Sequence, residues 1–113
     1  MRITAGGVYR VLGPASAIAT SLAEAGWSAV VVPAASSTAE FYRGLAAAAG
    51  FPGWFGANLD ALWDTLTDLT GPTALVLERW TRLARAEPGD WPRIFAVLEE
   101  RAAIAPPFAV VLS

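Results

Sequence analysis

Apolar residues gather in short segments that alternate with segments bounded by helix signals. Continuous apolar runs rich in valine and leucine occupy residues 27–33, 73–77 and 108–112, and such runs are typical of strands buried on both faces of a parallel sheet. Residues 7–12 predict a further short strand. The intervening segments predict helices over residues 15–25, 38–49, 59–69, 80–85 and 91–104. This alternation predicts an α/β fold with a small parallel sheet.

Several residues mark the expected helix ends. Ser37 followed three residues later by Glu40 is a capping-box pattern for the helix over residues 38–49, and Gly50 is a typical residue to close it. Asn58 and Asp90 are good N-cap residues for the helices that follow them.

The helix over residues 59–69 divides into two faces of opposite character. Its leucines share one sector of the helical wheel, as expected of a stripe that faces the core: Leu59, Leu62, Leu66 and Leu69. Its aspartates follow one another at i, i+4 and i+8 on the opposite side: Asp60, Asp64 and Asp68. Trp63 lies between the two faces. Like charges at this spacing destabilise a helix by about 0.2–0.5 kcal/mol per pair, so the aspartates disfavour the helix that carries them.

Basic residues are absent from residues 44–78, which surround this acidic helix. Uncompensated charge of this kind often marks a functional surface. Two structural interpretations stay open: the aspartates are simply solvated, and Trp63 and the loop aromatics Trp54 and Phe55 cover the core.

Composition and charge exclude several classes of function. The chain has 113 residues, of which 55% are hydrophobic, and this length predicts one domain over residues 1–113. A net charge of −2 and a pI near 4.9 disfavour nucleic acid as a direct partner. Cysteine and histidine are absent, so no disulfide, no thiolate or imidazole metal site and no Ser-His or Cys-His nucleophile pair is available.

The location that we expect is the cytoplasm. The first residues lack an uninterrupted apolar region before a cleavage motif, because Arg10, Gly13 and Pro14 break it. No run of eighteen or more apolar residues predicts a membrane span.

One stretch is similar to a known family. The proline, aromatic pair and glycine of residues 52–56, followed by the run NLDALWD at residues 58–64, closely resemble the signature of the barstar family of ribonuclease inhibitors. The segment TALVLE at residues 73–78 and the final VLEERAAIAPPFAVVLS also resemble that family. Together the similar segments span about residues 34–113.

The resemblance implies a barstar-like three-layer α/β fold, with helices around a parallel sheet of three strands, or of four if the N-terminal segment adds one. We therefore divide the chain into an N-terminal strand–helix extension, residues 1–26, and a barstar-like core, residues 27–113. The resemblance also implies the residues that would bind the partner: Trp54, Phe55, Gly56, Asn58, Asp60, Trp63, Asp64, Thr67 and Glu100. Asp64 would be the central anchor at the place of a substrate phosphate, with Asp60 at the rim of the nuclease cleft and Glu100 at the periphery.

The function that this implies is an immunity or antitoxin protein that blocks a small basic ribonuclease in a one-to-one complex, without cofactor or metal. An alternative is a non-inhibitory interaction module or homodimer on the same fold. A third reading is an enzyme that uses Asp60 and Asp64 as a carboxylate pair, but these residues would lie on a convex helix rather than in a cleft.

Overall fold

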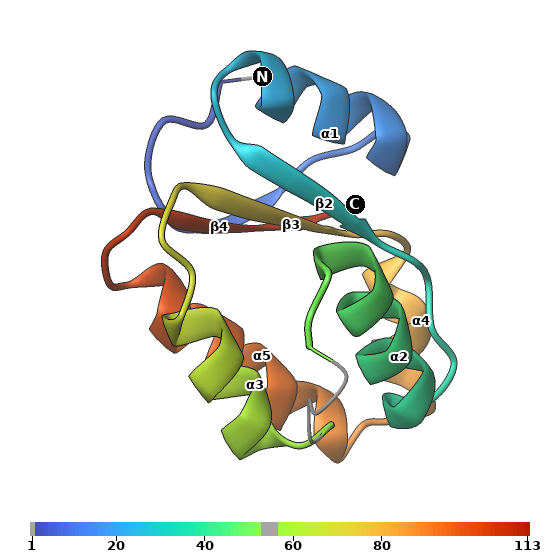
Figure 1. The fold of residues 1–113 in the computed structure, drawn as a ribbon. Helices are drawn as coiled ribbons and strands as arrows, with labels where there is room; N and C mark the ends of the chain where they lie inside the picture. Colours follow the sequence, from blue (N-terminus) through green and yellow to red (C-terminus); the bar gives the residue numbers. More distant parts are fainter. Residues whose placement is uncertain (1, 53–56) are drawn as a thin grey trace.

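The computed structural model describes residues 2–52 and 57–113, which form four strands and five helices (Figure 1). In chain order the elements are β1 (Gly7–Arg10), α1 (Ala15–Glu24), β2 (Ser28–Val32), α2 (Thr38–Ala49), α3 (Leu59–Thr67), β3 (Thr73–Leu77), α4 (Trp80–Ala86), α5 (Asp90–Ala102) and β4 (Phe108–Leu112). The predicted α/β class is confirmed.

The strands form one parallel sheet in the order β1-β4-β3-β2. Every residue of the inner strands β3 and β4 is buried, as the continuous apolar runs predicted. The N-terminal segment does add a fourth strand, because β1 pairs with β4. This strand ends at Arg10 and not at Leu12 as predicted, and the side chain of Leu12 is 96% exposed.

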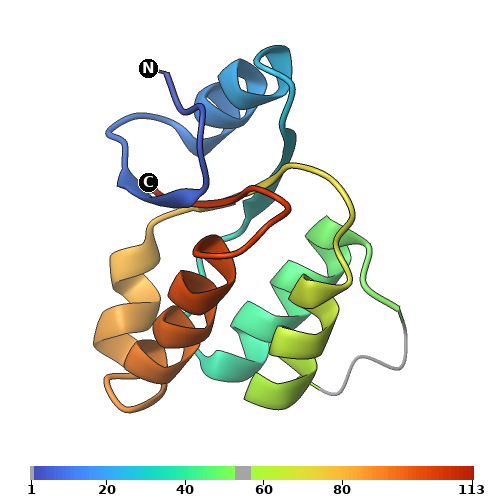
Figure 2. The ribbon, with the colours of Figure 1, turned by 90° about the vertical axis from the view of Figure 1, so that its left-hand side faces the viewer.

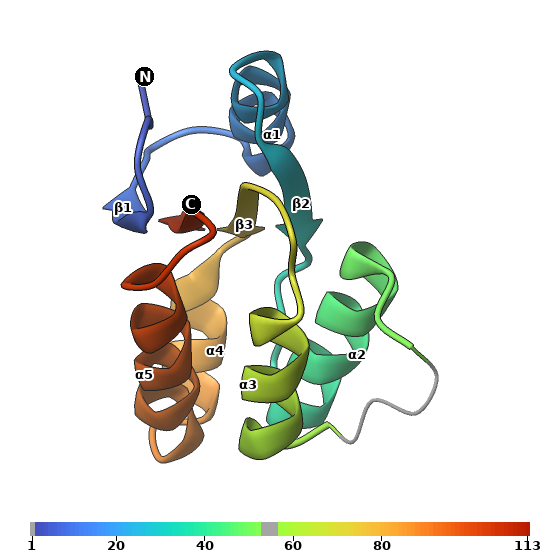
Figure 3. The same ribbon diagram turned by 60° about the vertical axis from the view of Figure 1, so that its left-hand side comes forward.

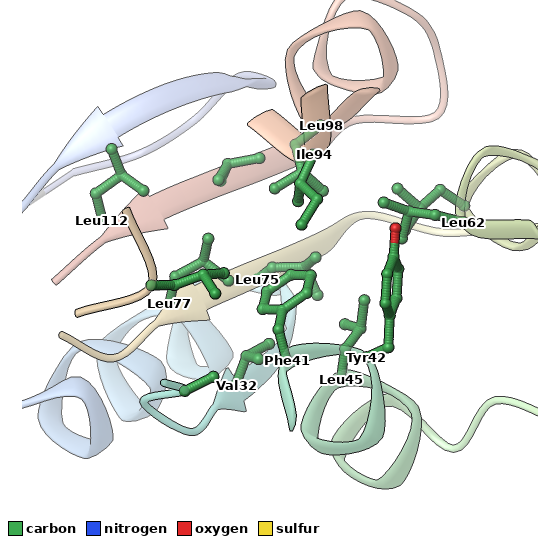
Figure 4. Close-up of a cluster of buried hydrophobic side chains, with 14 of the residues drawn as sticks. Val32, Phe41, Tyr42, Leu45, Leu62, Leu75, Leu77, Ile94, Leu98 and Leu112 are labelled. Carbon is green, nitrogen blue, oxygen red and sulfur yellow. The ribbon is translucent and has the colours of Figure 1, made fainter. Parts of the chain in front are cut away.

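Helices cover both faces of the sheet, which gives the expected three layers (Figures 1 and 3). Alternate residues of β3 and β4 point to opposite faces. Leu75 and Val110 join the core beneath α2–α5, whereas Val76 and Val111 join a smaller core beneath α1. Figure 4 shows side chains from α2, α3, α5 and the sheet meeting in the larger core.

The N-terminal segment is fixed to the rest of the chain by specific contacts. The indole Nε1 of buried Trp27 donates to the carbonyl oxygen of Ile3 over 2.9 Å. Gly6 lies so close to α5 and β4 that a Cβ atom there would be 3.0 Å from the carbonyl oxygens of Ala102 and Phe108. Glycine therefore permits the close approach of β1 to the sheet.

Most helix ends follow the sequence signals. The hydroxyl of Ser37 accepts a hydrogen bond from the backbone N–H of Glu40 at 3.1 Å, and Gly50 closes α2 in the left-handed conformation. The Asn58 side chain accepts from the N–H of Ala61 at 2.8 Å. The prediction for Asp90 was wrong, because Gly89 occupies the N-cap position and α5 begins at Asp90 itself.

The carboxylate of Asp90 instead accepts a hydrogen bond from the Thr38 hydroxyl at 2.6 Å, which ties α5 to α2. Helix α3 also ends two residues before the predicted Leu69, at Thr67. The carbonyls of its last turn find other donors, which are described below.

Candidate protein-binding surface on helix α3

Helix α3 is anchored by its leucine stripe. Leu62 and Leu66 are 0% exposed, and Leu59 and Leu69 are partly buried against the same core. The stripe packs chiefly against α5. This burial fixes the orientation of the helix, so the residues on its outer face have defined positions.

The outer face of α3 carries the acid that the sequence predicted there. Asp60, Asp64 and Asp68 are all exposed. Within residues 2–52 and 57–113, none of these carboxylates has an arginine or a hydrogen-bond donor as a partner. Asp60 lies in the first turn, where the helix dipole favours an anion, whereas Asp68 lies at the C-cap, where the dipole disfavours one. The row is therefore electrostatically costly to the isolated protein.

The other candidate residues of the described chain lie on α3, at its start, or on the neighbouring helix α5. Trp63 is half-buried on α3, and Asn58 is exposed at its start. Thr67 is exposed, and its hydroxyl donates to the carbonyl oxygen of Asp64 at 2.9 Å. Glu100 is exposed on α5, the helix against which α3 packs. The candidates Trp54, Phe55 and Gly56 lie outside the described residues.

The chain enters α3 through a strained residue. Ala57 has a φ of 50°, a left-handed conformation that costs a non-glycine residue about 1–2 kcal/mol. Strain of this kind often accompanies functional segments. Here it directs the chain into the Asn58 cap at the amino end of the acidic helix.

Arg101 on α5 helps to position α3, a role that was not predicted from the sequence. Its side chain is 1% exposed, and its Nε donates to the carbonyl oxygen of Leu66 at 2.8 Å. Its Nη1 donates to the carbonyl oxygens of Ile104 and Pro106 at 2.9 and 3.0 Å. Desolvation lowers the pKa of this guanidinium from its ordinary value. The buried cation thus joins the last turn of α3 to the segment between α5 and β4.

A signal for Arg101 does exist in the sequence. It follows Ile94 and Leu98 at helical spacing, on the apolar stripe of α5, where all three residues are buried. A charged residue at a position of the apolar stripe predicts one of two things. Either the stripe is interrupted there, or the charged group is buried and has specific hydrogen-bond partners.

The arrangement suits recognition of a cationic surface. Three carboxylates follow one another along a helix that is held by its buried leucines, with a half-buried indole beside them. Such a row is complementary to a cluster of arginine or lysine side chains. Among the described residues, no group of three or more acidic side chains is placed to hold a metal ion. No helix in the described part of the chain is both long and apolar enough to cross a membrane.

Comparison with protein-family models matches residues 29–113 to the family described as Barstar (barnase inhibitor). The match includes α2–α5 and β2–β4 except the first residue of β2, and it leaves out β1 and α1. A search of curated proteins finds no match.

Proposed function

The chain belongs to the barstar family, and from this premise we propose that it inhibits a small basic ribonuclease by covering the nuclease active site with α3. In this proposal the protein acts in the cytoplasm as an immunity or antitoxin factor, protecting the cell that makes the nuclease. The observation that carries the proposal is the row of exposed carboxylates on α3, which have no partner among residues 2–52 and 57–113.

The chemistry of RNA cleavage supports this pairing. A site that cleaves RNA must stabilise phosphoryl charge and is therefore lined with cationic groups. A helix with Asp60, Asp64 and Asp68 in a row offers anions that can occupy the places of phosphates. The helix is held by buried leucines, so little conformational entropy is lost when these carboxylates meet their partners.

We assign the central role to Asp64, the middle carboxylate of the row, and place Asp60 at the rim of the nuclease cleft. Trp63 and Thr67 would contact the nuclease beside them, and Glu100 would meet a basic residue at the periphery. The preceding residues Asn58 and, in the segment outside the described residues, Trp54, Phe55 and Gly56 would complete the surface.

Binding accounts for the surface better than catalysis does. Asp60 and Asp64 lie on the outer face of a helix, whereas catalytic groups are usually placed in a concave pocket that excludes water. The chain also has no histidine to serve as a general acid or base. We therefore propose that the protein carries out no reaction and binds one nuclease molecule.

The test is titration of a purified barnase-type ribonuclease with this protein while cleavage of a fluorogenic RNA is measured. We expect activity to fall to zero at a one-to-one ratio. Asp64→Ala should weaken inhibition strongly, because leaving a buried charge without its partner costs about 3–5 kcal/mol. Glu24→Ala is the matched control, since it removes an exposed carboxylate from α1, on the other side of the sheet.

Two results would contradict the proposal. One is full nuclease activity at excess inhibitor with every basic microbial ribonuclease tried. The other is self-association of the free protein that survives Asp64→Ala, which would favour the homodimer or interaction module instead.

A further inference from the structure

A second candidate site lies at the carboxyl edge of the sheet. The connection after β1 leads to α1 on one face, whereas the connection after β3 leads to α4 on the other face. Strand β4 lies between these two strands and ends at the same edge. In open parallel α/β sheets, ligands bind in the crevice where neighbouring connections leave in opposite directions.

A crevice of about 660 Å³ is present at this edge. It is lined by Arg79, Thr81, Arg82, Arg85, Ala86 and Ser113. Its volume falls within the range of about 300–1,000 Å³ that is usual for small-molecule sites, although it is a shallow surface crevice, open to solvent, and not an enclosed cavity. The hydroxyl of Ser113 donates to the carbonyl oxygen of Gly13 at 3.0 Å, which holds the end of β4 against the connection after β1.

The crevice concentrates positive charge in an acidic protein. Arg79, Arg82 and Arg85 are exposed, and none of them is paired with a carboxylate in the described part of the chain. The acidic residues that flank α4 are engaged elsewhere. Glu78 accepts from the N–H of Ala34 at 3.4 Å, and Glu87 accepts from the N–H of Thr38 at 3.0 Å.

Two further features lie beside these basic groups. Arg79 has φ and ψ of 44° and 50°, a left-handed conformation that is unfavourable for arginine and that is often found at functional sites. At the end of β1, the guanidinium of Arg10 lies 5.7 Å from the centre of the Trp80 ring, which places a fourth cation beside α4.

From the crevice, its place in the sheet and its arginines, which have no acidic partner in the described part of the chain, we infer a binding site for a phosphate-bearing ligand of nucleotide size. Guanidinium groups bind phosphate oxygens through paired hydrogen bonds, and the hydroxyls of Thr81 and Ser113 are further polar groups in the lining. Helix α4 lies on the opposite side of the helical layer from α3 (Figures 1 and 2). The site is therefore separate from the proposed nuclease-binding surface and does not depend on that proposal.

The experiment is isothermal titration calorimetry of the full chain with ADP, inorganic pyrophosphate and adenosine, with ¹H–¹⁵N spectra to locate the shifts. We expect ADP and pyrophosphate to bind and to shift the amides of residues 79–86, and adenosine not to bind. Arg82→Gln should weaken the binding of ADP about tenfold. Arg2→Gln is the matched control, because Arg2 is exposed beside the loops that precede β2 and β3, at the amino edge of the sheet.

Arg79→Asn provides a second variant whose fold should be secure. Asparagine tolerates the left-handed conformation better than arginine, so the stability should not fall, while the affinity for ADP should. A 5′-phosphorylated dinucleotide, compared with ADP, distinguishes an RNA end from a free nucleotide as the source of the phosphate. The inference is overturned if pyrophosphate fails to bind, or if Arg2→Gln weakens binding as much as Arg82→Gln does.

Discussion

The Nε of Arg101 on α5 donates to the carbonyl oxygen of Leu66 in the last turn of α3, over 2.8 Å. The last carbonyls of a helix have no partner within the helix, and a cation there also complements the helix dipole. Because Arg101 is almost fully buried, water cannot replace it. The position of the acidic helix thus depends on a side chain that is itself hidden from any partner.

Arg101→Met should therefore destabilise the protein. The change removes the arginine donor from three carbonyl groups, of which that of Leu66 keeps the N–H of Leu69 at 3.4 Å, and a buried carbonyl left without a donor costs about 1–3 kcal/mol. The change also removes the cost of burying a charge, which acts in the opposite direction. We expect a net loss of about 2 kcal/mol in the free energy of unfolding, measured by urea denaturation. Arg93→Met, at an exposed position of the same helix, should change stability by less than about 0.5 kcal/mol. Equal effects of the two variants would refute the positioning role.

Two aspartates of α3 should have opposite effects on stability. Asp68→Asn removes an anion from the negative end of the helix dipole and a like charge four residues from Asp64, so we expect a gain of about 0.5–1 kcal/mol. Asp60→Asn removes an anion from the favourable end, although it also relieves repulsion with Asp64, so we expect a small loss of about 0.3 kcal/mol. Thermal and urea unfolding of both variants measure the difference, and a destabilised Asp68→Asn would contradict this account.

The parts of the fold that follow from local chemistry could be predicted from the sequence. Helix α2 begins and ends as predicted, because Ser37 supplies a cap and Gly50 adopts the left-handed conformation that ends it. Strands β3 and β4 also have the predicted bounds, because their apolar runs are buried on both faces. On α3, the spacing alone placed the leucines inside and the aspartates outside.

Contacts between distant segments could not be predicted in this way. No periodicity places β1 beside β4, and β1 lies outside the segment that matches the family. Asp90 has the chemistry of an N-cap, but its hydrogen bond to Thr38 of α2 is a tertiary contact that local rules do not include. The hydrogen bond from Arg101 to the last turn of α3 is likewise a tertiary contact, because Arg101 comes from another helix.

Tyr42 should make the protein less stable at alkaline pH. Burial, and to a lesser degree the charge of Asp90, raises the pKa of Tyr42 above its ordinary value of 10.0. Because the pKa is raised in the folded state, the fold favours the neutral phenol. This contribution to stability is complete at pH values below the unfolded-state pKa, and it is lost as the pH rises through the folded-state pKa. Urea denaturation between about pH 8 and 11 should show stability falling above about pH 10. In Tyr42→Phe this fall should be smaller, and an unchanged slope would exclude Tyr42 as its cause.

Gly6 should tolerate no side chain. A Cβ atom there would be 3.0 Å from two backbone carbonyl oxygens, which cannot move without shifting α5 or β4. Gly6→Ala should therefore cost about 1–3 kcal/mol, as overpacking usually does. Gly71→Ala is the matched control, since nothing lies within 4 Å of its added methyl group and its φ is not in the left-handed region. A Gly6→Ala variant as stable as the control would show that the N-terminal segment does not pack closely on the sheet.

The proposed complex should form at a rate that depends strongly on salt. Attraction between the aspartates of α3 and a cationic nuclease acts over distances longer than a contact, and salt screens it with a length of about 10 Å at 0.1 M. Stopped-flow measurement from about 0.05 to 0.5 M salt should show a steep fall in the association rate and little change in the dissociation rate.

Asp68→Asn should reduce this dependence of the association rate on salt, because it removes one exposed charge from the surface. Asp64→Ala should in addition accelerate dissociation, since this variant would leave a nuclease cation buried without a partner. Association that is independent of salt would mean that the acidic row does not face the nuclease.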